Sequence, residues 1–166
     1  MANFTTNSYT NRNARPNQSH NRRPQGNSNL DFTSIQRIER PLSLYYAENQ
    51  DTYLIDGPLY RTAASIKSLS SSQLRKVLNL TKEALAIVKH SEQDFDKAKT
   101  RLFMLLPMMA YNTGRASNKE KEIFNHLLAF IYRNVSPESI QSPSDIQVFD
   151  QVITSVVAYH KLLGGK

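Results

Sequence analysis

The chain has 166 residues and a formal net charge of +7 at neutral pH, a balance that favours a polyanionic partner such as nucleic acid over a merely solvated basic surface. It has no cysteine, which excludes disulfides, thiolate metal sites and a cysteine nucleophile. Its apolar runs are shorter than the roughly 18 residues of a membrane span, and its first residues lack a secretory signal, so we expect a cytoplasmic protein with no membrane partner.

Residues 1–30 are predicted to form a disordered basic arm. The segment is rich in asparagine and poor in aliphatic residues, so it cannot bury enough apolar surface to offset its conformational entropy. Residues 1–40 carry six arginines against two acidic residues, which is more than half of the net charge of the chain. Such an arm either adds non-specific affinity for phosphate or is an inert tail.

Residues 31–57 are predicted to be an irregular lead-in. Apolar residues occur here, but Pro41 interrupts the pattern. We expect at most one short helical turn, around Ser34 to Glu39.

From residue 58 onward the pattern is helical. Pro58 suits the first position of a short helix that ends near Leu69. A long helix follows a run of serines and ends near His90, with apolar residues at spacings of three and four. Ser91, Asn118 and Ser144 are predicted to cap the next three helices, and Gly164 to end the last one. The sequence therefore predicts an all-α protein, in which residues 58–166 form a compact bundle of about five helices.

The third of these segments contains a proline within an apolar run, "MLLPMMAYNTGR", from Met104 to Arg115. Pro107 removes a backbone donor and clashes with the preceding turn, so the helix must kink or restart there. Tyr111 and Arg115 are four residues apart and would share a helix face. They either stack a base and hold its phosphate, or serve as a core tyrosine and a C-terminal cap.

No arrangement of residues indicates catalysis. The four histidines (His20, His90, His126 and His160) are far apart in sequence, and no glycine-rich phosphate loop or nucleophile turn is present. We therefore expect a binding protein, not an enzyme, without a metal or another cofactor.

Basic residues follow the second predicted helix in a regular pattern. Arg75, Lys82 and Lys89 are spaced by seven residues, two helical turns apart each time, with Lys76 further round. Such a stripe either tracks a phosphate backbone or is an ordinary solvated face. A second basic cluster, which includes Arg101, precedes the apolar run.

Three short motifs resemble, in order and spacing, the small helical subunit of the type III-A CRISPR effector, the Csm complex. They are "SSQLRKVLNL" (Ser71–Leu80), "LLPMMAYNTGR" (Leu105–Arg115) and "VVAYHKLLGGK" (Val156–Lys166). The resemblance covers about residues 54–166 and leaves the N-terminal arm out. One residue departs from the family pattern, because Met108 stands where a lysine or arginine is frequent.

The resemblance implies a non-catalytic, RNA-binding scaffold subunit of an antiviral ribonucleoprotein. Such subunits stack along the complex, bind other Csm subunits and contact the guide RNA–target RNA duplex without reading its sequence. The motifs place phosphate contacts at Arg75, Lys76, Arg115 and Lys161, whereas Lys82, Arg101 and Tyr111 are candidates from helix spacing. Tyr159 and His160 match as well, but either serve the bundle or meet a neighbouring copy. Two other readings are a protein–protein adaptor with incidental charge and the related small subunit of other type III effectors.

Overall fold

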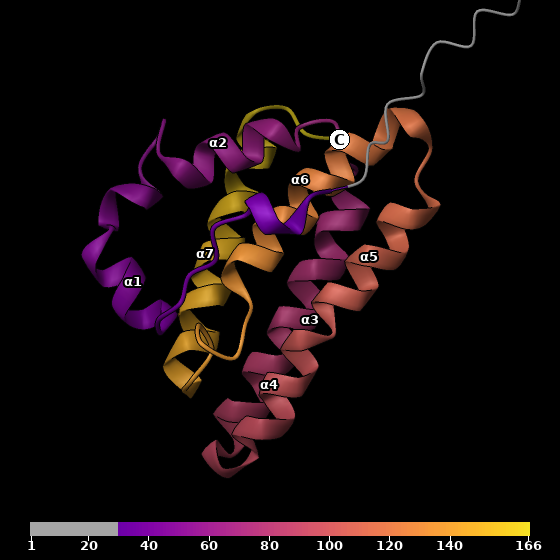
Figure 1. Cartoon of the computed structure of the whole chain (residues 1–166). Coiled ribbons are helices and arrows are strands. Elements are labelled where there is room, and N and C mark those ends of the chain that lie inside the picture. Colours follow the sequence, from indigo (N-terminus) through magenta and orange to yellow (C-terminus); the bar gives the residue numbers. More distant parts are fainter. Residues whose placement is uncertain (1–29) are drawn as a thin grey trace, which may run out of the picture.

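The computed structural model describes residues 30–166, and all regular elements among these residues are helices, with no strand (Figure 1). The long elements are seven α-helices: α1 (Leu42–Glu48), α2 (Pro58–Ser65), α3 (Ser71–His90), α4 (Phe95–Phe103), α5 (Leu105–Arg115), α6 (Asn118–Asn134) and α7 (Pro143–Leu162). Three short 3₁₀ helices cover Phe32–Ser34, Gln50–Tyr53 and Glu92–Asp94. The all-α prediction is confirmed; the predicted arm lies outside the described residues, apart from Leu30.

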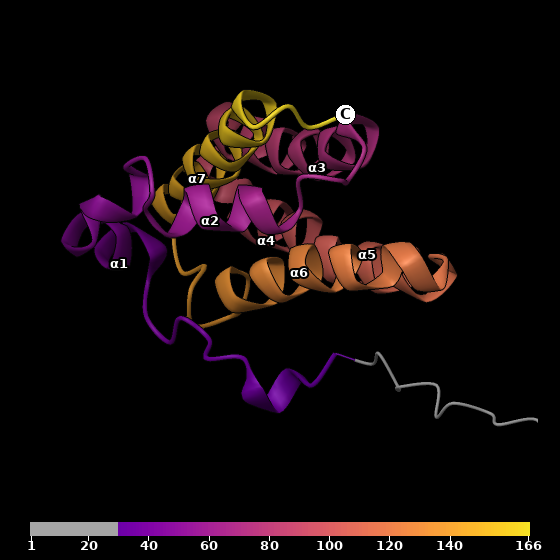
Figure 2. The ribbon, with the colours of Figure 1, turned by 90° about the horizontal axis from the view of Figure 1, so that it is seen from above.

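The helices enclose one apolar core. Helix α3 packs against α4 and α7, α2 packs against α7, and α5 packs against α6. Seen from above, α3 and α7 lie on one side of the molecule, and residues 30–41 pass along the opposite side, outside α6 (Figure 2). The largest fully buried side chains come from every helix: Leu42, Leu59, Leu74, Leu102, Leu105, Ile131 and Phe149 are examples. No helix within residues 30–166 is both long and apolar enough to cross a bilayer.

Three helices begin at residues other than those the sequence analysis favoured. Ser91 precedes the 3₁₀ helix Glu92–Asp94, and Asp94 is the residue before α4. Ser117, not Asn118, caps α6, and Ser142, not Ser144, caps α7. In each case the serine accepts a bond from the backbone three residues on, and Glu120 or Asp145 at that position reaches back to the cap. These reciprocal bonds satisfy two backbone donors at once, and Pro143 occupies the first turn of α7 without loss.

The segment around Pro107 forms two helices instead of one. Helix α4 ends at Phe103, and α5 begins at Leu105, so the break precedes the proline. The proline ring excludes the carbonyl of residue 103 from its normal helical bond, which explains the position of the break. Pro107 itself lies in the first turn of α5, where a missing N–H has little cost.

The lead-in is more ordered than its sequence indicates. A helical turn was expected around Ser34 to Glu39, but the 3₁₀ turn lies at Phe32–Ser34, and a full helix, α1, follows Pro41. The Ile38 N–H donates to the Arg133 carbonyl (3.0 Å), and the Leu42 N–H to the Ser139 carbonyl (3.0 Å). The lead-in is therefore fixed by the last turn of α6 and by the connection from α6 to α7, and its own sequence does not reveal these contacts.

Asp145 joins the lead-in to the bundle. Its side chain accepts bonds from the backbone N–H groups of Ser43 (2.8 Å), Gln141 (3.0 Å) and Ser142 (2.9 Å). Burial acts to raise the pKa of this carboxyl, but the hydrogen bonds, those from Ser43 foremost, outweigh it and lower the pKa below its ordinary value. One carboxylate thus caps α7 and also holds the start of α1.

Candidate nucleic-acid interface

Several of the predicted contact residues gather where α3 begins, α5 ends and α6 begins. A hollow of about 300 Å³ opens there, which we term the α5 hollow; it is lined by Gln73, Lys76, Asn112, Arg115, Ala116, Glu120 and Phe124. Lys76 comes from the first two turns of α3, and Arg115 is the last residue of α5. The Glu120 carboxylate faces the same hollow but accepts a bond from the Ser117 hydroxyl (2.6 Å). The fold therefore brings together two cations that are 39 residues apart.

Tyr111 and Arg115 form a pair on the exposed face of α5. An Arg115 Nη1–H donates to the Tyr111 hydroxyl (2.8 Å), and the guanidinium carbon lies 5.4 Å from the centre of the tyrosine ring. Tyr111 is 61% exposed, so it is not a core residue. The pairing aligns a cation with an aromatic ring at the rim of the hollow, which is the combination that contacts nucleic acid in many proteins.

The stripe on α3 follows the line where α3 packs against α7, which we call the α3–α7 seam. Lys82 forms an ion pair with Asp150 of α7 (Nζ to Oδ2, 2.7 Å). Lys89 lines a hollow together with Pro143, Ser144 and Gln147 at the start of α7. Because Asp150 is largely buried while Lys82 is half exposed, much of the charge of this lysine is balanced by its own protein.

Lys161 lies toward the Arg75 end of this seam. Helices α3 and α7 run antiparallel, since Lys89 meets the start of α7 and Ser71 donates to the carbonyl of Lys166. Lys161 follows Asp150 by eleven residues, three helical turns, so it returns to the same face of α7. Both Arg75 and Lys161 are exposed.

Arg101 belongs to a different face. On α4 its Nε–H donates to the Glu83 carboxylate of α3 (2.8 Å), and a second guanidinium nitrogen contacts the same oxygen. Nearby, the Lys99 ammonium lies 5.7 Å from the ring centres of both Phe95 and Phe103. The fold does not bring Arg101 to the α5 hollow.

His160 and Tyr159 have partners inside the protein. The His160 ring is buried, and its Nε2 lies 3.0 Å from the Leu69 carbonyl oxygen. A side chain on Gly165 would overlap this ring, which accounts for a glycine at that position. The Tyr159 hydroxyl donates to the Tyr53 carbonyl. These contacts favour a structural role within the bundle over contact with a neighbouring copy.

Sequence reasoning missed the amide side chains of Gln73 and Asn112. Each precedes a predicted cation, Lys76 or Arg115, by three residues, so helix periodicity alone would have placed it on the same face. The carboxylates of Glu83 and Asp150 were also missed, and no sequence signal identifies them because each meets its cation through tertiary packing. Among residues 30–166, no group of three histidine, aspartate or glutamate side chains is arranged to hold a metal ion.

Comparison with models of known protein families identifies a family for this chain. The family model described as Csm2 Type III-A matches residues 58–166, from the start of α2 to the end of the chain. Neither the curated proteins nor the solved structures contain a significant match. The matched region holds the α5 hollow and the α3–α7 seam but leaves out the lead-in. The chain therefore belongs to the Csm2 family of type III-A CRISPR effectors, as a small subunit of the Csm complex.

Proposed function

We propose that this subunit is a non-catalytic scaffold that holds the guide RNA–target RNA duplex by its phosphates. The observation that carries the proposal is the position of Arg115. Its guanidinium is held by a neutral partner, the Tyr111 hydroxyl, and it lines the α5 hollow together with Lys76. A cation oriented by a neutral group keeps its charge for an external anion.

The proposed contact surface runs from the α5 hollow toward the α3–α7 seam. Arg75, Lys76, Arg115 and Lys161 are exposed cations on this path. Lys82 and Arg101 make weaker contacts in this proposal, because Asp150 and Glu83 compete with phosphate for them. None of these side chains needs to read a base, since pairing between the two RNA strands supplies the sequence specificity.

The remaining surface serves protein contacts in this proposal. Membership in the Csm2 family supports assembly with other Csm subunits, and we extend this to stacking between copies of the chain. Leu54 and Ile55 present large, exposed apolar side chains on the loop between α1 and α2, and Leu162 does so at the end of α7. Apolar side chains of this kind are suited to burial against another subunit.

Neutralising the two arginines tests the RNA contact. In the full chain, the double variant Arg75→Gln/Arg115→Gln should bind a short RNA duplex about tenfold more weakly. The slope of log affinity against log salt concentration should decrease in magnitude by about 2, about one for each lost phosphate contact. A matched control, Lys67→Gln/Lys97→Gln, removes the same charge from exposed lysines elsewhere and should change affinity much less. Fluorescence anisotropy gives the affinities, and thermal melting verifies that both variants fold.

Purification of the protein from its native host tests the assignment as a whole. We expect a large complex of several subunits with short RNAs that share a repeat-derived 5′ end. Protein partners without RNA, even at low salt, would instead support the adaptor reading, and the basic residues would then be a solvated surface.

A further inference from the structure

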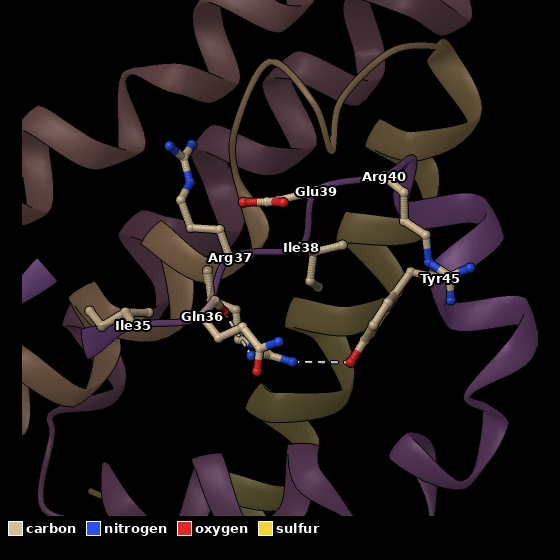
Figure 3. A pocket seen from close by; sticks show the side chains of 8 residues that line it. Ile35, Gln36, Arg37, Ile38, Glu39, Arg40 and Tyr45 are labelled. Carbon is tan, nitrogen blue, oxygen red and sulfur yellow. Dashed lines mark hydrogen bonds between the residues drawn. The ribbon is translucent and has the colours of Figure 1, made fainter. Parts of the chain in front are cut away.

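The lead-in forms a second basic groove, outside the region that the family model matches. Residues 35–40 run in an extended conformation beside the end of α6 and the start of α1 (Figure 3). They enclose a groove of about 580 Å³, which we call the N-terminal groove; its lining consists of Ile35, Gln36, Arg37, Ile38, Glu39, Arg40, Tyr45 and Arg133. Three of these eight side chains are arginines. The groove is larger than the α5 hollow.

Arg133 is held in the groove by neutral groups. Its Nη1–H donates to the Gln36 carbonyl (2.8 Å), and its Nη2–H donates to the Tyr45 hydroxyl (3.1 Å). Neither partner is an acid, so the positive charge of Arg133 is oriented but not neutralised by these bonds. The same bonds fix the extended segment against α6, which makes the groove a built feature of the fold.

The other two arginines lie on tyrosine rings. The Arg37 guanidinium carbon is 4.8 Å from the ring centre of Tyr132, and that of Arg40 is 5.5 Å from the ring centre of Tyr45. Figure 3 shows Arg40 alongside Tyr45 and Arg37 extended away from them, so the two cations lie at different points along the groove. The Nε of Arg37 is buried and has no hydrogen-bond partner within residues 30–166.

Acidic side chains balance only part of this charge. Glu39 lines the groove, and Glu48 forms an exposed ion pair with Arg40 (2.7 Å). Glu138 has a lowered pKa, mainly through hydrogen bonds at its own backbone and at Ser136, with a smaller contribution from Arg37. Arg133 forms an ion pair with none of these three carboxylates, and its two hydrogen-bond partners in the groove are neutral.

We propose that the N-terminal groove binds the phosphodiester backbone of single-stranded RNA, as a second RNA site of this subunit. Arginine forks match phosphate oxygens, and arginine–aromatic pairs are the surfaces on which unpaired nucleotides stack. The volume of the groove suits a small ligand portion, such as one or two nucleotides of a single strand. The site lies on the opposite side of the molecule from α3 and α7 (Figure 2), so a single strand here is separate from the duplex of the proposed function.

An acidic peptide is the competing ligand, and two features favour RNA over it. The arginines pair with aromatic rings, which gives a nucleotide contacts that a carboxylate side chain does not make. The sequence just before the groove also carries four arginines within residues 12–23, a density of positive charge suited to a polyanion.

The experiment uses the full chain and a fluorescent oligouridine that is too short to pair with itself. The double variant Arg37→Gln/Arg40→Gln should bind it about 10- to 25-fold more weakly at 0.1 M salt. The salt slope should fall by about 1.4, which corresponds to two lost contacts with a single strand. Binding of blunt RNA duplex should stay within twofold, as should oligouridine binding by the matched control Lys67→Gln/Lys97→Gln. Unchanged oligouridine affinity in the groove variant would overturn this inference and leave the duplex proposal, tested at Arg75 and Arg115, unaffected.

A second variant tests the groove by a gain of affinity, which misfolding does not mimic. Glu39→Gln removes the carboxylate from the lining and should strengthen oligouridine binding severalfold. Glu92→Gln, an exposed acid at the far turn between α3 and α4, makes the same charge change and should have little effect. Equal gains in both variants would show that the net charge of the protein, and not the groove, determines the affinity, and would overturn the inference. So would groove-dependent binding of an acidic peptide in place of oligouridine.

Discussion

The bundle (residues 58–166) and the lead-in (residues 31–57) acquire their structure in different ways. Helices α3, α6 and α7 are long, have apolar residues at helical spacing and carry recognisable caps, so each is specified largely by its own sequence. The lead-in has one short helix and an extended stretch, and its backbone bonds are made to Arg133 and Ser139 in the bundle. Contacts with the surface of the bundle therefore determine the structure of the lead-in.

The basic residues do not divide between the two regions in this way, because each region holds cations with acidic partners and cations with neutral partners. In the bundle, Lys82 and Arg101 meet carboxylates of neighbouring helices, and their charges help to hold the fold together. At the N-terminal groove, Arg37 of the lead-in lies on a tyrosine ring, and Arg133 of α6 bonds to a carbonyl and a hydroxyl. Arg40 of the lead-in, in contrast, forms an ion pair with Glu48. Counting cations along the sequence does not separate these cases, but their partners do.

The largest expected effect comes from the apolar anchor of the lead-in. Leu42 is fully buried in α1, whereas Leu44 on the same helix is 55% exposed. Leu42→Ala should lower the free energy of unfolding by about 2–5 kcal/mol, because it removes buried contacts and leaves a cavity. Leu44→Ala is the matched control and should change it by less than about 0.5 kcal/mol. Denaturant melts that gave equal, small effects would show that the lead-in does not form part of the cooperative fold.

Asp145 is the next test, since it ties the two regions together. Asp145→Ala leaves three backbone donors without their acceptor and should cost about 2–4 kcal/mol. Because folding lowers the pKa of this carboxyl, its stabilisation is fully present above the unfolded pKa, near 3.8, and is lost as the pH falls through the lower folded value. The variant should lack this acid-sensitive share of stability. If acid melts of the variant and the wild-type chain ran parallel below pH 4, the carboxylate would not be the group responsible.

The extent to which the sequence predicted the fold follows from this contrast. The all-α class and the long segments of the bundle could be read from periodicity and capping residues, with errors of one to three positions at Asp94, Ser117 and Ser142. Helix α1 could not, because it has only seven residues and follows a proline, and burial of Leu42 and Tyr46 against distant helices stabilises it. Short elements are decided by tertiary contacts that local patterns do not contain.

The candidate site was predictable only in part, for a related reason. The pairing of Tyr111 with Arg115 follows from their spacing on one helix, and the two side chains are hydrogen-bonded in the structure. The approach of Arg115 to Lys76 depends on how α5 and α3 pack. The ion pairs at Lys82 and Arg101 depend on packing in the same way. Helix periodicity identifies residues that are neighbours within one helix, but it does not predict contacts between different helices.

A smaller effect is expected at the α3–α7 seam, where it separates structural from RNA-binding cations. Lys82→Gln removes the partner of the largely buried Asp150 and should lower the free energy of unfolding by about 1 kcal/mol. Arg75→Gln, one stripe position earlier and exposed, should leave stability within about 0.5 kcal/mol and lower duplex RNA affinity more than Lys82→Gln does. The reverse order in binding, measured by anisotropy, would place the phosphate contact at Lys82 despite its ion pair.

The smallest expected change in stability concerns Pro107, although its consequence for binding is informative. Pro107→Ala restores a backbone N–H that can bond to the Phe103 carbonyl, so α4 and α5 can join into one continuous helix. The free energy of unfolding should change by less than about 1 kcal/mol, since the proline already lies in a tolerated first-turn position. A straighter helix would move Tyr111 and Arg115 relative to Lys76, and duplex RNA affinity should fall severalfold.

Pro58→Ala, at the start of α2 with no break to remove, is the matched control. Unchanged affinity in Pro107→Ala would mean that packing against α6, and not the break at Met104, determines where Arg115 points.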